Sequence, residues 1–197
     1  ARNQPRKMLD RTFKAFAIFC KDKPDALLLL HMDPQDPASS FDIINLVTRL
    51  KLNNRVRFTG MRCFDGFDYK EMNNVYNLMD VFLLTTSGEG FGVPIIEAHA
   101  CGVPTIMTDY TTAQELIIQD GQCGEVVKVA AEITGGWNVE RAIMDDNDCA
   151  DKLNKLYNDK ELRRKYGEVG RKKIVEKYSW DVITPMWDKL FREAIKI

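Results

Sequence analysis

Two carboxylates, Glu89 and Glu97, stand eight residues apart and are the side chains in this sequence best placed to do chemistry. Glu89 lies within residues 87–92, where glycine occupies alternate positions and lets the backbone take dihedral angles that other residues avoid. A carboxylate there would repel a phosphate placed directly beside it, but it can accept hydrogen bonds from a polyhydroxylated group. Glu97 can accept hydrogen bonds from the hydroxyls of a ring such as ribose. The pattern therefore predicts a ligand that carries both hydroxyls and phosphates.

The elements around these carboxylates form a recognisable unit. An apolar run of strand length, residues 81–84, precedes the glycine-rich turn. Pro94 at the first helical position and Gly102 just past the last one predict a helix between them. A second apolar strand, residues 105–107, completes a parallel βαβ unit. Because the turn opens a helix, its free N–H groups and the positive end of the helix dipole face outward, which suits an anion.

The rest of the chain alternates between helical and strand-like apolar patterns, so we expect an α/β fold with a parallel sheet. Ser39 or Ser40 is expected to cap the second helix, Ser179 the last one, and Tyr76 is expected to serve packing. Pro185 should kink the last helix. Strands are predicted within residues 26–30, 56–60 and 125–129, and helices within residues 8–20, 41–50, 69–78, 151–157, 160–177 and after 179.

The segment SGEGFGVPIIEAHACGVP, which carries Glu89 and Glu97, resembles the signature of retaining GT-B glycosyltransferases, specifically glycosyltransferase family 4. The resemblance implies that Glu89 and the adjacent glycine amides hold the donor sugar, and that Glu97 holds the ribose of the nucleotide. The further donor-binding candidates in this segment are Gly88, Gly90, Phe91, Gly92 and Val93.

A basic pair lies near the start of the chain. Arg2 and Lys7 are five residues apart and flank a turn that contains a proline. In family 4, an Arg and a Lys at this separation contact the donor diphosphate, so the resemblance gives these two residues that role. From spacing alone a solvated basic turn is the alternative, and Arg6 is expected to be a bystander. The catalytic candidates are therefore Glu89, Arg2 and Lys7.

The loop after the strand at residues 56–60 is implied by the resemblance to pack against the nucleobase. Its candidates are Met61, Arg62 and Cys63. The loop is longer and richer in aromatic residues than the family pattern, with Phe64 and Phe67, so the identity of the base stays open.

Another departure from the family follows the second strand of the central unit. Many relatives have a Gly-Gly-x-x-Glu turn here, whereas this chain keeps Glu115 and has Thr111 and Thr112 in place of the glycines. Threonine does not easily take the positive φ that glycine allows. Either the turn is built differently, or hydroxyls replace backbone groups in the pocket.

Residues 130–151 look like an insertion relative to the shorter family pattern. Asp146 and Asp148 match the Asp-x-Asp pattern of metal-dependent GT-A transferases, but we interpret them as capping the next helix. We expect no metal and no cofactor.

Composition limits the remaining function classes. The 28 Lys and Arg nearly balance the 29 Asp and Glu, which gives no support for a nucleic-acid partner. No apolar run approaches the roughly 20 residues that cross a bilayer, and no secretory signal is evident. The five cysteines show no metal-ligand spacing, which favours reduced thiols and a cytoplasmic protein. Residues 160–177 are basic; contact with anionic lipid is one interpretation, and a solvated helix face is the one we favour.

These expectations combine into one hypothesis. The resemblance implies that residues 1–197 form a single Rossmann-like α/β/α sandwich, the C-terminal lobe of a GT-B fold, with the N-terminal acceptor lobe absent from this chain. The intact protein is expected to transfer a hexose from a UDP- or GDP-linked donor to an unknown acceptor, with retention at the anomeric carbon. Trp180 and Trp187 would suit docking to the missing lobe, and the fragment alone is expected to be inactive.

Two other classes stay open on the sequence. Gly88-x-Gly90-x-Gly92 with Asp109 resembles the fingerprint of an NAD-dependent Rossmann dehydrogenase, although Val93 occupies the place of its third glycine. The other class is a non-catalytic nucleotide-sugar-binding domain. A GT-B enzyme that hydrolyses or epimerises nucleotide sugars is a nearer alternative.

Overall fold

A computed structural model describes residues 2–37, 39–62 and 65–195. The strands are β1 (Leu28–Leu30), β2 (Val56–Phe58), β3 (Phe82–Leu84), β4 (Thr105–Thr108), β5 (Gly124–Val127), β6 (Val129–Thr134) and β7 (Glu140–Met144). The α-helices are α1 (Leu9–Phe19), α2 (Ile43–Arg49), α3 (Tyr69–Asn77), α4 (Val93–Ala100), α5 (Asp146–Asn158), α6 (Lys160–Lys177) and α7 (Trp180–Ile195).

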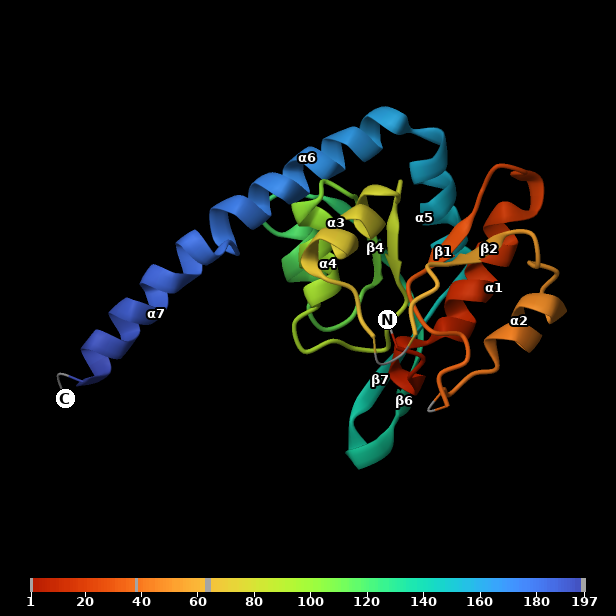
Figure 1. The fold of residues 1–197 in the computed structure, drawn as a ribbon, viewed down its shortest axis with the longest axis horizontal. Helices are drawn as coiled ribbons and strands as arrows, with labels where there is room; N and C mark the ends of the chain where they lie inside the picture. The colour runs from red at the N-terminus through yellow and green to blue at the C-terminus, as the bar shows by residue number, and fades with distance from the viewer. Residues whose placement is uncertain (1, 38, 63–64, 196–197) are drawn as a thin grey trace.

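The strands up to β5 pair in parallel and are separated by helices, as the sequence predicts. β1 pairs with β2, and β3, β4 and β5 form a second sheet in that order. Only β6 and β7 pair antiparallel among the described strands. Figure 1 shows the helices arranged around these sheets, so the expected α/β class is confirmed.

Strand β4 lies in the middle of its sheet, and all four of its residues are buried. Because side chains alternate along a strand, Ile106 and Met107 enter different cores. Ile106 packs with residues of α1 and α5, and Met107 packs with residues of α4 and the turn after β4. The sheet is therefore covered on both faces, which is the expected α/β/α layering.

Helix α1 links the two parallel sheets. Phe13 and Phe16 pack in the core that contains Leu30 and Val56 of β1 and β2, whereas Ala15 belongs to the core beneath β4. Its apolar residues at helical spacing therefore serve two cores rather than one stripe on a single sheet.

Two helix caps differ from the sequence expectation. Asp42, not Ser39 or Ser40, caps α2 by accepting a hydrogen bond from the Asn45 amide at 2.9 Å. The serines lie too early, because helix α2 begins only at Ile43. Ser179 directly precedes α7, but its hydroxyl donates to the Val175 carbonyl at 2.9 Å.

The acidic residues before α5 divide their roles. Asp145 caps the helix, so the expectation that Asp146 and Asp148 do so was wrong. Asp146 instead pairs with Arg11 of α1 at 3.0 Å, and Asp148 accepts a hydrogen bond from the Lys128 amide. Among the described residues, no three His, Cys, Asp or Glu side chains gather in a way that would hold a metal ion.

The segment interpreted as an insertion forms the β6–β7 hairpin and the start of α5. The hairpin leaves the carboxyl end of β5 and protrudes from the body, with a short 3-10 turn, Gly136–Asn138, at its tip (Figure 1). Its base is held at the sheet, because the Ala142 amide donates to the Ser87 carbonyl at 3.1 Å. The hairpin thus begins beside the glycine-rich turn.

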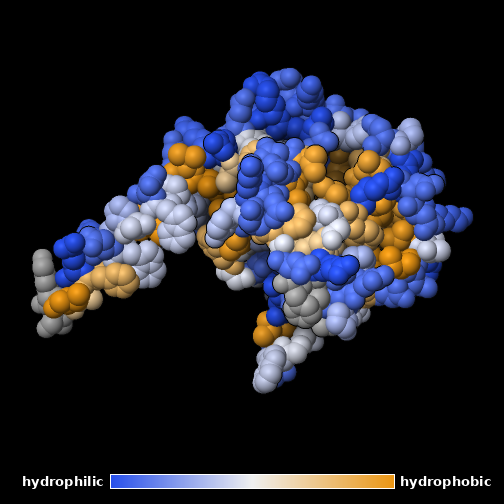
Figure 2. All heavy atoms as spheres, viewed as in Figure 1, coloured by the Kyte–Doolittle hydropathy of each residue, from blue (hydrophilic) through white to orange (hydrophobic). Residues whose placement is uncertain are grey.

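The two C-terminal helices behave differently. Helix α6 packs on α4, whereas α7 extends away from the body and buries none of its described residues (Figure 1). Trp180, Trp187 and Phe191 of α7 are at least half exposed, and apolar side chains line this helix in Figure 2. None of the helices in the described ranges is both long enough and apolar enough to cross a bilayer.

The contact between α4 and α6 requires glycine at residue 167. A Cβ there would lie 2.1 Å from the Gly102 carbonyl oxygen, so the helices could not keep their spacing. We expect Gly167→Ala to lower the free energy of unfolding by about 2 kcal/mol, because the backbone clash outweighs the helix propensity of alanine. Urea unfolding measures the difference. Gly136→Ala, where a Cβ meets nothing within 4 Å, is the matched control. Equal stability of both variants would contradict the assigned packing.

Candidate active site

The candidate residues gather at one edge of the sheet. The glycine-rich turn follows β3, Tyr110 and Thr111 follow β4, and the β6–β7 hairpin follows β5. Because β3, β4 and β5 are parallel neighbours, their carboxyl ends meet at the same edge, which is where open α/β sheets bind ligands.

A buried polar segment after β3 fixes the basic turn of the N-terminal region beside the glycines. Thr85 donates a hydrogen bond to the Lys7 carbonyl at 3.1 Å, and the Ser87 amide donates to the Arg6 carbonyl at 2.8 Å. Both Thr85 and Ser87 are at most 2% exposed. Residues far apart in the sequence are therefore held together by hydrogen bonds from short buried side chains and one amide to backbone carbonyls of the N-terminal turn.

These contacts bring Lys7 and Arg6 to Glu89. The Lys7 Nζ atom lies 2.5 Å from a Glu89 carboxylate oxygen, and Arg6 reaches the same oxygen at 3.0 Å. The side chains of Glu89 and Lys7 are only 8% and 9% exposed. Burial by itself would raise the pKa of Glu89, but the hydrogen bond and the charge of Lys7, with help from Thr86 and Arg6, lower that pKa below its ordinary value. Glu89 is thus held as a carboxylate.

The backbone of Glu89 is also held. Its amide donates a hydrogen bond to the Thr111 hydroxyl at 3.1 Å, and that hydroxyl donates to the Tyr110 carbonyl at 2.8 Å. Thr111 takes a positive φ of 53°, the conformation that glycine would adopt more easily. Thr111 therefore adopts the backbone that glycine would adopt, so at this residue the turn is not built differently. Its hydroxyl enters the turn, in line with the second alternative raised by the sequence.

The start of α4 combines a glycine at positive φ with a buried hydroxyl that has no partner among the described residues. Gly92 has a φ of 100° and directly precedes Val93, the first residue of the helix. Pro94, expected at the first helical position, is the second. The Thr112 hydroxyl lies 3.6 Å from the place of a Cβ at Gly92 and is buried without a hydrogen-bond partner among the described residues. Pro94 has no N–H, and the Ile95 and Ile96 amides donate to the Gly92 carbonyl at 2.8 and 3.4 Å. The amides left for a ligand are therefore those of the glycine-rich turn up to Val93.

Glu97 is oriented by a residue that sequence reasoning assigned to packing alone. The Tyr76 hydroxyl donates a hydrogen bond to Glu97 Oε2 at 2.7 Å, and burial, followed by this bond, raises the pKa of Tyr76. The Tyr76 ring is 5% exposed and stands edge-on to Phe82. Nothing in the local sequence reveals this role, because the two residues meet only when α3 packs beside α4.

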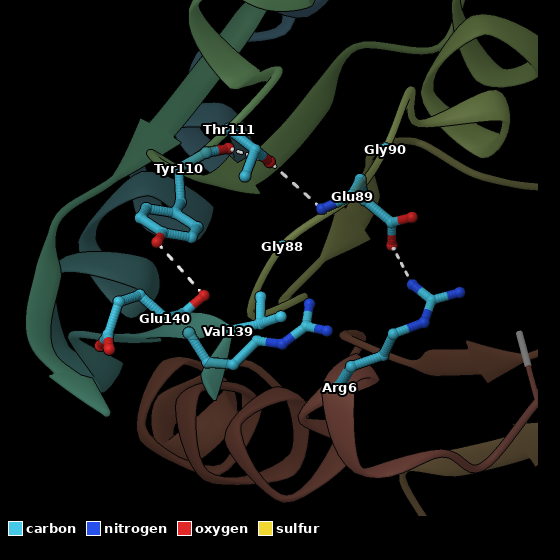
Figure 3. Close-up of a pocket in the computed structure, with 9 residues that line it drawn as sticks. Arg6, Gly88, Glu89, Gly90, Tyr110, Thr111, Val139 and Glu140 are labelled. Carbon is cyan, nitrogen blue, oxygen red and sulfur yellow. Dashed lines mark hydrogen bonds and ion pairs between the residues drawn. The ribbon is translucent and has the colours of Figure 1, made fainter. Parts of the chain in front are cut away.

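A pocket of about 500 Å³ opens beside Glu89 (Figure 3). Arg6 and Tyr110 stand on opposite sides of it, and the hairpin provides part of its wall. Sequence reasoning gave the hairpin residues no role, because the pairing that places them beside the glycines spans long sequence distances. The pocket is lined by Arg6, Gly88, Glu89, Gly90, Tyr110, Thr111, Val139, Glu140 and Arg141.

The basic pair expected from the sequence is separated in the structure. Arg2 pairs with Asp36 at 2.7 Å and lines a second hollow of about 130 Å³, which Met61 also lines. Arg6, expected to be a bystander, contacts Glu89 instead, so that expectation was wrong. The cause is the 3-10 turn Pro5–Lys7, which carries Arg6 and Lys7 to one carboxylate. A contact of Arg2 with the diphosphate stays a prediction.

Three other predicted donor-binding residues, Phe91, Val93 and Arg62, line neither hollow. Phe91 and Val93 are about half exposed at the start of α4, and the Phe91 ring lies 5.9 Å from that of Tyr178. Arg62 is exposed beyond Met61. Cys63 lies outside the described residues.

The sequence of this chain is similar to those of known glycosyltransferases. The family model for glycosyl transferases group 1 matches residues 1–173. N-acetyl-alpha-D-glucosaminyl L-malate synthase of Bacillus anthracis is 28% identical over 193 residues, which are 96% of this chain and 43% of that protein. The chain spans less than half of the length of the curated relatives it matches.

Solved structures share the fold. The C-terminal domain of LpcC, a glycosyl transferase group 1 family protein from Francisella tularensis, has a TM-score of 0.69 and 24% identity. The match covers 90% of this chain and 83% of that domain. HepE from Anabaena, in complex with UDP, has a TM-score of 0.75 and 20% identity, over 98% of this chain and 47% of that protein.

The contact between Lys7 and Glu89 predicts how the pKa of Glu89 changes when Lys7 is replaced. Replacing Lys7 with Met removes the main group that stabilises the charged carboxylate, whereas burial remains, so we expect the pKa of Glu89 to rise relative to the wild-type chain. The wild-type carboxylate stabilises the fold above the ordinary glutamate pKa, and this contribution is lost as pH falls through the lowered pKa. Carboxyl-carbon NMR titration of Glu89 measures the change.

Lys70→Met is the matched control, because Lys70 is an exposed lysine on α3. An unchanged Glu89 titration in the Lys7 variant would contradict the assigned contact. The difference in the free energy of unfolding between the wild type and Lys7→Met should also become smaller in acid, because Glu89 is then protonated in both proteins.

Proposed function

The chain belongs to the glycosyl transferases group 1 family, and on that premise we propose that it is the donor-binding lobe of a retaining glycosyltransferase that uses a nucleoside diphosphate hexose. Membership of this family argues against the dehydrogenase hypothesis that the glycine spacing raised. Asp109, the acid that alternative would need for a ribose, accepts a hydrogen bond from Gln114 at 2.6 Å.

The observation that carries the proposal is the buried contact of Glu89 with Lys7 and Arg6 beside the start of α4. An anionic carboxylate next to the amides of the glycine-rich turn that leads into α4 fits a ligand that is polyhydroxylated at one end and anionic at the other. A nucleotide sugar has this composition. The hexose would meet Glu89, and the diphosphate would meet the amides of residues 90–93.

Donor binding would then require an exchange of partners. In the structure Lys7 and Arg6 neutralise Glu89. A bound diphosphate would attract these cations, and the hexose hydroxyls would replace them at the Glu89 carboxylate. The leaving diphosphate gains negative charge as the bond to the anomeric carbon breaks. Each well-aimed donor at such a charge contributes about 3–4 kcal/mol to the stability of the transition state.

Glu97 would bind the ribose with its remaining oxygen. One carboxylate oxygen already accepts from Tyr76, which fixes the orientation of the group. The second oxygen is then directed outward on an exposed part of α4, because Glu97 is exposed. The hollow lined by Arg2 and Met61 would take the nucleobase. The UDP complex of HepE, a protein of the same fold, supports a uridine donor among the candidates.

The acceptor and the catalytic cleft would involve the remainder of the protein. The chain covers 43% of the B. anthracis relative, so a partner lobe of similar size is expected in the full-length protein. The exposed apolar side chains of α7, including Trp180 and Trp187, would dock on that lobe. In the absence of the partner lobe the chain would bind the donor without transferring the sugar.

Isothermal calorimetry of the chain with UDP, GDP and ADP, and with their glucose or mannose conjugates, tests the proposal directly. The LpcC structure supports working with the lobe alone, because it contains only a C-terminal domain. We expect one base to bind preferentially, and one sugar conjugate to bind more tightly than its bare nucleotide. No binding of any of these ligands would overturn the proposal.

Replacing each of the two carboxylates should reduce affinity for a different part of the donor. Glu97→Gln is expected to weaken bare nucleotide binding about tenfold, because a charged hydrogen-bond acceptor of the ribose is lost. Glu89→Gln should leave bare nucleotide affinity nearly unchanged and remove the extra affinity given by the sugar. Glu132→Gln, an exposed glutamate on β6, is the matched control. If both site variants behave like this control, the assigned contacts are wrong.

Tyr76→Phe tests the positioning of Glu97. The ring and its packing against Phe82 are kept, and only the hydroxyl that holds the carboxylate is lost. We expect nucleotide affinity to fall about threefold, the effect of one neutral hydrogen bond. The double variant with Glu97→Gln should bind no more weakly than Glu97→Gln alone. Additive losses would show that Tyr76 acts independently of Glu97.

A further inference from the structure

The β6–β7 hairpin carries a cation into the candidate donor pocket. Arg141 lies on β7 opposite Ile133 of β6, and it lines the pocket beside Gly88 and Arg6. Its position is specified by two glycines. The Arg141 NH1 atom is 3.2 Å from the place of a Cβ at Gly88, and its Cγ atom is 3.1 Å from that place at Gly135. A Cβ at either glycine would press on the Arg141 side chain, which would have to shift by a few tenths of an ångström.

The charge of Arg141 is not balanced within the described part of the chain. Its half-buried guanidinium makes no ion pair and no hydrogen bond with the described residues. The other charged side chains of the pocket are engaged: Arg6 pairs with Glu89, and the Glu140 carboxylate accepts a hydrogen bond from Thr134 at 2.7 Å. A guanidinium presents five N–H donors in a planar fork that matches a carboxylate or a phosphate.

We propose that Arg141 forms a binding site for an oxyanion, a carboxylate or a phosphate, carried by the sugar or by the acceptor. This inference rests on the proposed function of the pocket. Arg141 lies beside Gly88, which precedes Glu89 in the sequence, whereas residues 90–93 follow it. We assign the anion at Arg141 to a group other than the donor diphosphate, and nucleotide affinity tests that assignment. The hairpin makes the lobe selective for acidic substrates.

The first experiment uses inorganic phosphate as the probe. Phosphate is titrated into the chain with and without saturating UDP or GDP, and the arginine Nε–Hε resonances are followed by NMR. We expect Arg141→Gln to weaken phosphate binding about tenfold, because charge-assisted hydrogen bonds are lost. Arg141→Lys should keep part of the affinity. Arg49→Gln, which removes an exposed arginine on α2, should behave as wild type.

Nucleotide affinity separates this site from the diphosphate site. Arg141→Gln should bind bare UDP or GDP as wild type does, with an unchanged thermal unfolding midpoint. An equal loss of nucleotide and phosphate affinity would overturn the inference, because Arg141 would then be a ligand of the diphosphate. Unchanged phosphate binding would overturn it as well. If no nucleotide binds at all, the proposed function fails, while phosphate alone still reports on Arg141.

The second experiment identifies the source of the anion. In the donor arm, UDP-glucuronate is compared with UDP-glucose. In the acceptor arm, glucose 6-phosphate is compared with glucose in the presence of UDP. An advantage of the acidic compound that disappears in Arg141→Gln assigns the anion to that arm. If neither acidic compound has such an advantage, or only an advantage that Arg141→Gln keeps, then Arg141 does not select an acidic substrate.

Discussion

The structure of this edge of the sheet depends on one buried carboxylate. Glu89 is almost fully enclosed, and without Lys7 and Arg6 its burial would favour the protonated form. The positions of the cations follow from this requirement: the segment after β3 uses threonine and serine side chains, and the Ser87 amide, to bind the backbone of the N-terminal turn. Contacts between the segment after β3 and the turn Pro5–Lys7 thus bring the cations to the carboxylate. A sugar that displaces the cations would donate its hydroxyl hydrogen bonds to Glu89, in the place where Lys7 and Arg6 donate now.

The parallel sheet explains why several unrelated loops meet here. Each of β3, β4 and β5 delivers its following loop to the same edge, and each loop brings a different chemistry. The first brings Glu89, the second brings the Thr111 hydroxyl, and the third brings the hairpin. Thr111 keeps a positive φ that costs a β-branched residue free energy, and its hydroxyl bond to the Glu89 amide offsets part of that cost. The departure from a glycine pair is therefore linked to how firmly the turn is held.

Much of this fold follows from local sequence patterns, whereas the site follows only in part. The unit from β3 to β4 and the two glutamates are visible because the glycines, the proline and the apolar runs act within a short segment. The contact of Arg6 with Glu89, and the separation of Arg2 from Lys7, were not predictable from spacing. They depend on how the turn Pro5–Lys7 is bound by the segment that follows β3. Tyr76 and the hairpin residues were missed for the same reason. Their partners are set by the packing of elements that are distant in sequence.

The central claim is that an activated sugar replaces the cations at Glu89. A crystal structure of the chain soaked with the UDP- or GDP-hexose that binds it tests this most directly. The account predicts that the contacts of Glu89 with Lys7 and Arg6 open, that sugar hydroxyls take their place at the carboxylate, and that the ribose meets Glu97. Density for the donor elsewhere, with the contact between Lys7 and Glu89 intact, would contradict it.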